Sequence, residues 1–227
     1  MLKRVVNLVI RFLLFFLCKT DRKALNAVPQ KGPMILVGNH VNFLDAPLAF
    51  TFLYPRKIIS LVKKETFENP VLRFLFNTWG SIAVSRRTAD FNALGKAIKI
   101  LKQGMFFAIF PEGTRTNDGC LIQGHPGIII VALKSKVPIL PIVHYGAEHF
   151  SENFKKLKRT KITFQVGKPF ILKPSCPFPR KEERQLMTDE IMYQLAKLLP
   201  EKYRGYYSDL SKTTTQFLNF DTSSNVP

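Results

Sequence analysis

The chain has 227 residues, which is enough for one domain with a substantial hydrophobic core. Its 34 lysine and arginine residues against 16 aspartate and glutamate residues give a formal charge of +18, which predicts a polyanionic partner such as nucleic acid, an anionic bilayer or a phosphorylated substrate. The three cysteines, Cys18, Cys120 and Cys176, are too few and too far apart for a disulfide framework or a zinc site, so we expect a reducing, cytoplasmic setting.

The N-terminal segment from Val5 to Cys18 is strongly apolar, with basic residues on both sides. It is shorter than the roughly 20 residues that a membrane-spanning helix needs. On a helix, Arg4, Asn7 and Arg11 form one polar stripe, which is typical of a helix that lies along a bilayer surface. A signal peptide begins in a similar way, but no small-residue cleavage site follows. We predict an interfacial membrane helix within residues 1–23; a helix that covers the protein's own core is the alternative.

Short apolar runs alternate with helical patterns through the rest of the chain. Strands are predicted over residues 34–38, 57–62, 81–84, 105–110 and 137–143, with a more exposed strand near a sheet edge over 161–166. Helices are predicted over residues 45–53, 70–78, 90–103, 126–135 and 180–199. This alternation predicts an α/β fold with a mixed, largely parallel sheet flanked by helices. The polar, serine- and threonine-rich stretch 208–227 is predicted to be disordered.

A histidine and an aspartate stand just after the first predicted strand, in the segment NHVNFLD at residues 39–45. His40 is suited to be a general base near neutral pH, and Asp45 could fix its tautomer and stabilise its charged form. The chain contains no Gly-x-Ser-x-Gly nucleophile motif. The pair should therefore activate the hydroxyl of a substrate. The structural alternative is a histidine that caps a helix or bonds a core carbonyl.

A second motif, FPEGTR at residues 110–115, follows another predicted strand. Gly113 can take the positive φ of a tight turn, which exposes backbone N–H groups to an anion. Arg115 adds a guanidinium fork that matches the geometry of a phosphate. The alternative is an ordinary β-turn with a surface arginine.

Two further features stand near predicted strand ends. Lys63 and Arg86 follow two short strands and could join Arg115 around one phosphate, although basic residues at such positions are commonly just solvated. The two prolines of VPILPI, at residues 137–142, predict an edge strand or a bulge. Such a strand could line an acyl groove, and protection of a sheet edge explains the prolines equally well.

Together these segments resemble the glycerolipid acyltransferase family, which includes 1-acylglycerol-3-phosphate acyltransferases of the PlsC type. The blocks NHVNFLDAP, KKE with GSIAVSRR, FPEGTR and VPILPI stand in the family's order and approximate spacing, over about residues 30 to 145. The resemblance implies a glycerol-3-phosphate acyltransferase-like domain over residues 24–207. It also implies transfer of a fatty acyl group from acyl-CoA or acyl-carrier protein to the hydroxyl of a lysophospholipid, with 1-acylglycerol-3-phosphate giving phosphatidic acid.

The resemblance also implies roles for individual residues. His40 becomes the general base and Asp45 the residue that orients it. Substrate contacts are implied for Asn39, Lys63, Arg86, Phe110, Glu112, Gly113, Thr114, Arg115 and Pro141. No metal and no cofactor is expected, because the acyl thioester is a co-substrate. Asn42 departs from the serine that is common in the family, and this departure bears on the acceptor more than on the reaction.

The positive charge then fits three anionic partners: an anionic membrane surface, the acyl donor and a phosphorylated glycerolipid acceptor. A dense basic run at residues 155–161 suits a bilayer or the donor. Nucleic acid is not expected, since no helix-turn-helix, RNA-recognition or zinc-finger signature is present. We expect a peripheral or monotopic protein on the cytoplasmic face of a membrane. The alternatives are another acceptor, such as glycerol 3-phosphate or another lysolipid, a hydrolase, and a non-catalytic basic membrane-binding protein.

Overall fold

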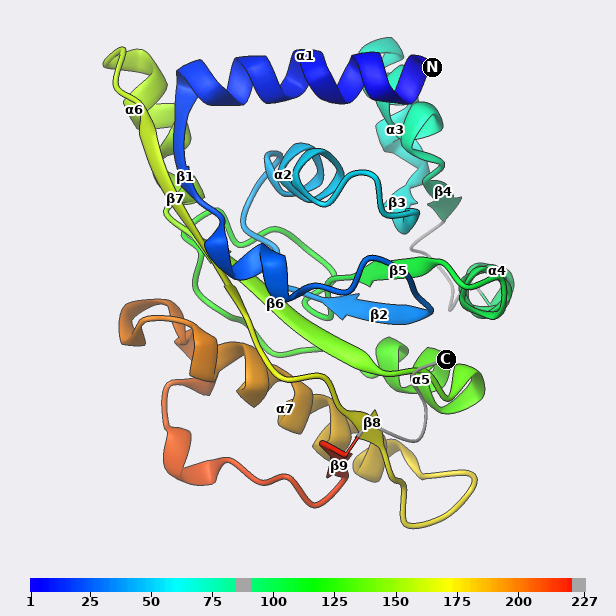
Figure 1. The fold of residues 1–227 in the computed structure, drawn as a ribbon. Coiled ribbons are helices and arrows are strands. Elements are labelled where there is room, and N and C mark those ends of the chain that lie inside the picture. Colours follow the sequence, from blue (N-terminus) through cyan, green and yellow to red (C-terminus); the bar gives the residue numbers. More distant parts are fainter. Residues whose placement is uncertain (85–90, 222–227) are drawn as a thin grey trace.

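The computed structural model describes residues 1–84 and 91–221. A seven-stranded sheet lies between two layers of helices (Figure 1). Its strand order is β1-β7-β6-β2-β5-β3-β4. The strands are β1 (Cys18–Asp21), β2 (Met34–Val37), β3 (Ile58–Lys63), β4 (Ile82–Val84), β5 (Phe106–Ile109), β6 (Ile139–Tyr145) and β7 (Thr160–Val166). The β6–β7 pair is antiparallel and the other neighbouring pairs are parallel, so the predicted α/β fold with a largely parallel sheet is confirmed.

One face of the sheet is covered by three helices from the first third of the chain: α1 (Leu2–Leu17), α2 (Asp45–Phe52) and α3 (Pro70–Trp79). The core on this face joins Leu36 of β2 and Phe106 of β5 to Leu48 of α2. Phe50 of α2 stacks on Trp79 of α3 with ring centroids 4.8 Å apart, which fixes these two helices to each other.

The opposite face is covered by α4 (Phe91–Lys102), α5 (Gly127–Ser135) and α7 (Lys181–Leu198). Here Val37 and Phe107 of the sheet pack with Ile128 of α5 and Ile191 of α7. A short helix, α6 (Phe150–Lys155), precedes β7 and was not predicted. Short 3₁₀ turns complete the chain: η1 (Lys23–Ala27), η2 (Lys64–Glu68), η3 (Ala147–His149), η4 (Glu201–Tyr203), η5 (Gly205–Tyr207) and η6 (Leu210–Lys212).

The N-terminal helix α1 lies along the top of the molecule in Figure 1 and leads directly into the sheet. The next residues form β1, which pairs in parallel with β7 from Cys18 opposite Thr160. The segment predicted over residues 1–23 therefore ends in a strand of the domain. Among the described residues, no helix is both long enough and apolar enough to cross a membrane.

The polar stripe predicted on α1 is divided between two faces of the helix. Asn7 is buried, and its Oδ1 accepts a hydrogen bond from Nε1 of Trp79 at 2.9 Å, whereas Arg4 and Arg11 are exposed. The rest of the outward face is apolar. Its exposed large side chains are Leu2, Val5, Leu8, Val9, Phe12, Leu13, Phe15 and Phe16.

Of the two alternatives predicted from the prolines of residues 137–142, an edge strand or a bulge, the edge strand is wrong, because β6 lies inside the sheet between β7 and β2. Pro141 has no N–H to donate to a neighbouring strand. Its carbonyl oxygen accepts the N–H of Gly167 at 2.9 Å, and the pairing of β6 with β7 begins at Ile142 opposite Val166. Pro141 therefore lies opposite Gly167, one residue beyond the end of β7. The hydrogen bond that the proline cannot donate is missing only at the end of the β6–β7 pairing.

The prediction of disorder from Ser208 onwards is wrong for residues 208–221, which pack against α7. Phe217 is buried, and β9 (Leu218–Asn219) pairs with β8 (Ile171–Leu172). The buried carboxylate of Glu190 on α7 accepts the backbone N–H groups of Gln216 and Phe217 at 2.8 and 2.9 Å. Residues 222–227 lie outside the described residues.

Candidate active site

The two principal motifs meet at the carboxyl ends of β2 and β5. These strands are parallel neighbours, so the loops that follow them leave the same edge of the sheet. The backbone N–H of His40 donates to Oε2 of Glu112 at 2.5 Å, and the N–H of Thr116 donates to the carbonyl oxygen of His40 at 3.0 Å. The segments NHVNFLD and FPEGTR therefore form one bonded unit.

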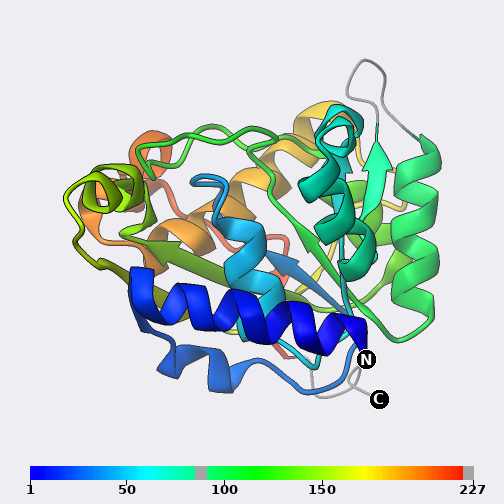
Figure 2. The same cartoon turned by 90° about the horizontal axis from the view of Figure 1, so that it is seen from above.

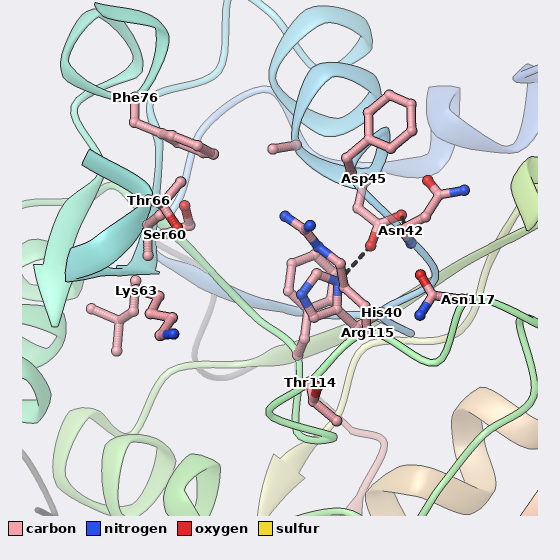
Figure 3. A pocket seen from close by; sticks show the side chains of 15 residues that line it. His40, Asn42, Asp45, Ser60, Lys63, Thr66, Phe76, Thr114, Arg115 and Asn117 are labelled. Carbon is pink, nitrogen blue, oxygen red and sulfur yellow. Dashed lines mark hydrogen bonds and ion pairs between the residues drawn. The ribbon is translucent and has the colours of Figure 1, made fainter. Parts of the chain in front are cut away.

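His40 and Asp45 are in direct contact, as their spacing predicted. Nδ1 of His40 lies 2.5 Å from Oδ2 of Asp45 (Figure 3). The imidazole ring stacks on Phe110 with centroids 4.5 Å apart. Asp45 is buried at the start of α2, whereas His40 is partly exposed. Because the carboxylate occupies Nδ1, the nitrogen of His40 left to exchange a proton with a substrate is Nε2.

A second histidine, His144 on β6, holds the other oxygen of Asp45. Its Nε2 lies 3.0 Å from Oδ1 of Asp45, which also accepts the backbone N–H of Asn42 at 3.1 Å. The main chain of His144 is fixed in turn by Asn39, whose side-chain amide donates to the carbonyl of His144 at 2.8 Å and accepts its N–H at 3.0 Å. The sequence analysis missed His144, which stands 99 residues from Asp45; the only signal was a histidine in an otherwise apolar strand.

The surroundings of Asp45 keep its carboxylate charged. Burial alone would raise the pKa of Asp45, but the hydrogen bonds from His144 and His40 outweigh burial and hold the pKa at about 2. At neutral pH the aspartate is therefore ionised between two imidazole rings. That arrangement can hold the Nδ1–H tautomer of His40 and stabilise its imidazolium form.

Glu112 was predicted to contact the substrate, but its carboxylate lies behind the pocket. Its residue is 1% exposed, and its two oxygens accept the backbone N–H groups of His40 and Ile122, the latter at 3.3 Å. Burial raises the pKa of Glu112 to about 7, although the two N–H groups act in the opposite direction. The side chain thus holds the main chain of the histidine. Gly113 has a φ of +67°, as the predicted tight turn requires.

A cavity of about 420 Å³ opens in front of His40 (Figure 3). Six of the predicted site residues line it, namely His40, Asp45, Lys63, Phe110, Thr114 and Arg115. Residues that were not predicted also line it, among them Asn42, Phe43, Ser60, Thr66, Phe76 and Asn117. Lys63 and Arg115 bring two positive charges, whereas Asp45 is the one acidic residue among the described residues of the lining. Such a pocket attracts an anionic substrate.

The remaining predicted residues lie elsewhere. Asn39 is buried beneath the pocket, where it bonds the main chain of β6. Pro141 lines a different hollow beside Gly167. Arg86 lies outside the described residues. Among the residues that the structure describes, no group of three or more His, Cys, Asp or Glu side chains is placed to hold a metal ion.

Asn42, which stands where the family commonly has serine, links the loop that carries His40 to η3. Its amide nitrogen donates to the carbonyl oxygen of Ala147 in η3 at 2.7 Å, and its Oδ1 accepts the N–H of Leu44 at 2.9 Å. A serine at this position would be too short to make both contacts. The longer side chain therefore fixes the loop that presents His40 and Asp45.

The sequence is similar to those of known acyltransferases. Residues 20–145 match the sequence model of the Acyltransferase family. The chain is 34% identical over 125 residues to the 1-acyl-sn-glycerol-3-phosphate acyltransferase of Borreliella burgdorferi, which covers 54% of this chain and 50% of that protein. It therefore spans about half the length of that relative. It is 26% identical over 171 residues to the protein of the same name from Bacillus subtilis, which covers 75% of this chain and 83% of that one.

The fold is also similar to a solved structure. The crystal structure of the 1-acyl-sn-glycerophosphate acyltransferase from Thermotoga maritima superimposes with a TM-score of 0.63 at 23% sequence identity. The match covers 86% of this chain and 78% of that one.

Proposed function

The chain belongs to the acyltransferase family, and we propose that it moves a fatty acyl group from an acyl thioester to the hydroxyl of a lysophospholipid. The observation that carries this proposal is the His40–Asp45 pair at the edge of a cationic pocket. In the described part of the chain, no serine, threonine or cysteine side chain is hydrogen-bonded to the His40 ring. A base without a protein nucleophile is suited to activate an external hydroxyl.

The reaction begins with both substrates bound. Nε2 of neutral His40 takes the proton of the acceptor hydroxyl while the hydroxyl oxygen attacks the thioester carbonyl. Asp45 keeps the proton of His40 on Nδ1 and stabilises the imidazolium that forms. The stack of the His40 ring on Phe110 and the bond from its backbone N–H to Glu112 keep the base in place during this step.

The tetrahedral intermediate carries an oxyanion that needs N–H donors. The N–H groups of Gly113 in the FPEGTR turn and of Thr116 just after it are already bonded to carbonyl oxygens within the protein. Among the described residues no acceptor is bonded to the N–H of Thr114 or Arg115, and the side chains of both residues line the pocket. We assign these two groups to the oxyanion. The C–S bond then breaks, and the imidazolium of His40 gives its proton to the leaving thiolate, which restores the neutral base.

Arg115 and Lys63 are the groups that would bind the phosphate of the acceptor. The relatives from Borreliella burgdorferi and Bacillus subtilis are named for 1-acyl-sn-glycerol-3-phosphate, and this acceptor would give phosphatidic acid here. The donor is acyl-CoA or acyl-carrier protein, both of which are anionic. The apolar outward face of α1, with Arg4 and Arg11 exposed beside it, supports peripheral binding to a membrane surface. We propose that this surface is the cytoplasmic face.

A reconstituted assay tests the proposal. Purified full-length protein is mixed with phosphatidylglycerol vesicles that contain 1-acylglycerol-3-phosphate, other lysolipids or neither, and is offered acyl-CoA or acyl-carrier protein. We expect phosphatidic acid to form only when donor and acceptor are both present. His40→Gln should slow the reaction by about 100-fold or more, the contribution typical of a general base.

Two results would contradict the proposal. Release of free fatty acid at the same rate with and without an acceptor would indicate a hydrolase. Full activity of the His40→Gln protein would remove the histidine from the mechanism. The vesicle-bound fraction of that variant should equal that of the unchanged protein, since His40 lies in the pocket and not on the apolar face of α1.

A further inference from the structure

We propose that the α6–β7 tip, residues 154–158, is a second membrane contact that works with α1 to seat the pocket mouth on an anionic lipid surface. This inference rests on the membrane seat of the proposed function. Leu157 at the tip is 95% exposed and has a φ of +53°, a left-handed conformation that is uncommon for leucine. Its N–H donates to the carbonyl of Phe154 at 3.1 Å, and the N–H of Lys158 donates to Asn153 at 2.8 Å. A well-bonded turn thus holds an apolar side chain out in water.

The charges around the tip are almost all of one sign. Residues 150–161 contain one acidic residue, Glu152, whose carboxylate pairs with Nζ of Lys156 at 2.5 Å. In the described part of the chain, neither Lys155 nor Lys158 has an ion-pair partner. These two lysines stand on either side of Leu157 in the sequence. An apolar side chain between lysines matches acyl chains beneath anionic headgroups, whereas a nucleic acid would gain nothing from the leucine.

Arg159 joins the tip to the N-terminal helix. Its guanidinium donates to the carbonyl oxygens of Phe15 and Cys18 at 2.6 and 2.7 Å and lies over the ring of Phe15, 5.4 Å from its centroid. A cation at these carbonyls complements the negative C-terminal end of α1. The tip and the apolar face of α1 consequently lie at the same end of the molecule (Figure 1).

Aromatic contacts connect the tip to the pocket. Phe43, which lines the cavity, packs edge-on against Phe150 with ring centroids 5.6 Å apart. Phe150 in turn stacks with Phe154 at 5.9 Å. Seen from above, α2, which carries Asp45, lies between α1, α3 and α6 (Figure 2). A bilayer that touches both α1 and the tip would therefore lie at the pocket mouth, where an acceptor lipid could enter without leaving the membrane.

The test compares Leu157→Ser with Phe178→Ser. Phe178 is a matched control because it is 89% exposed and stands near Arg180 and Lys181, in the loop between β8 and α7 at the far end from α1 (Figure 1). Sedimentation with phosphatidylglycerol vesicles that contain no acceptor measures binding of the full-length protein. We expect Leu157→Ser to weaken binding about tenfold, as loss of one inserted leucine implies, and Phe178→Ser to leave it unchanged. Equal binding by both variants and the unchanged protein would overturn the proposal.

A second experiment tests the lysines of the tip. It compares the double variant Lys155→Gln/Lys158→Gln with the control Lys173→Gln/Lys181→Gln. We expect about a fivefold loss of binding to phosphatidylglycerol vesicles for each tip lysine, and no loss with phosphatidylcholine vesicles. Unchanged vesicle binding together with a raised KM for acyl-carrier protein would overturn the proposal, because it would make the tip a docking site for the donor.

Turnover separates this inference from the proposed function. With a water-soluble short-chain acceptor, Leu157→Ser should retain the turnover of the unchanged protein, whereas with acceptor embedded in vesicles turnover should fall in proportion to the loss of binding. Loss of turnover on the soluble acceptor would overturn a membrane role for the tip. A protein that binds vesicles through Leu157 and transfers no acyl group would refute the proposed function alone.

Discussion

The replacement His144→Phe tests how Asp45 is held. It removes the Nε2 donor that lies 3.0 Å from Oδ1 of Asp45 and keeps an aromatic ring against Phe164, whose centroid lies 5.7 Å from that of the histidine. The carboxylate then retains His40 and the N–H of Asn42 as partners. Since the loop is otherwise unchanged, the effect reports on one hydrogen bond to a buried charge.

The magnitude follows from the pKa of Asp45, which is about 2 in the fold against an ordinary value of 3.8. A difference of this size is worth about 2 kcal/mol of stability at neutral pH, and His144 supplies a large part of it. We expect His144→Phe to lower the free energy of unfolding at pH 7 by about 1 to 2 kcal/mol. Because the folded pKa is depressed, this stabilisation is present above about pH 4 and is lost between pH 4 and 2. The two proteins should therefore converge as the pH falls through that range.

The assay combines urea unfolding with steady-state kinetics. We expect kcat to fall about tenfold, equivalent to about 1.4 kcal/mol, because a less firmly held Asp45 orients His40 less well. The acceptor KM should not change, since His144 is not one of the described residues that line the pocket. His144→Gln, which can place an amide N–H near the position of Nε2, should restore much of the loss. Lower stability with an unchanged kcat would show that His144 is only structural and would refute the reasoning.

Three further predictions concern the same loops. Glu112→Gln removes a carboxyl whose pKa is raised from 4.5 to about 7. Because the folded protein loses stability when it must ionise this group, the variant should gain up to about 3 kcal/mol of stability relative to the unchanged protein as the pH rises from 4.5 to 7. A stability difference between the two proteins that is the same at pH 5 and pH 8 in urea unfolding would contradict this. Arg115→Ala should raise the acceptor KM about tenfold with little change in kcat, while Arg180→Ala should alter neither. Asn42→Ser should cost about 1 kcal/mol by removing the bond from Asn42 to the carbonyl of Ala147, which still accepts the N–H of Phe150. An unchanged urea midpoint would show that the bond does not matter.

Apart from α6 and the short strands β1, β8 and β9, the strands and helices were predictable in order because their signals are local. The buried runs of β2 and β5 are apolar on both faces, as strands of a parallel sheet are. Residues 70–78 were predicted as a helix from a proline in the first turn, and α3 runs from Pro70 to Trp79, where Gly80 ends it in a left-handed conformation. His40 and Asp45 were predictable for the same reason, since one short loop carries both.

Features that depend on distant partners could not be predicted in this way. His144 reaches Asp45 only because β6 lies beside β2, and the sequence does not specify that strand order. The turn of the FPEGTR segment decides that Glu112 points behind the pocket while Arg115 lines it. Composition indicated disorder after Ser208, but the buried carboxylate of Glu190 binds that stretch, and an average over residues does not detect a single contact.

Two buried carboxylates near His40, those of Asp45 and Glu112, have pKa values shifted in opposite directions, so they become charged at different pH values. Hydrogen bonds keep Asp45 ionised, whereas burial holds the pKa of Glu112 at about 7. The two buried carboxylates near Lys63 and Arg115 therefore carry one full negative charge at lower pH and two above pH 7. The exposed carboxylate of Glu65 also lies 3.8 Å from Nζ of Lys63. The second buried charge, that of Glu112, should weaken the attraction for a phosphorylated acceptor.

We consequently expect the acceptor KM of the unchanged protein to rise between pH 6.5 and 8.5 by about two- to fivefold more than that of Glu112→Gln, whose side chain stays neutral. The comparison cancels the titration of the acceptor phosphate, which is the same for both proteins. Identical pH profiles of KM for the two proteins would show that Glu112 does not change charge in this range or that its charge does not affect acceptor binding.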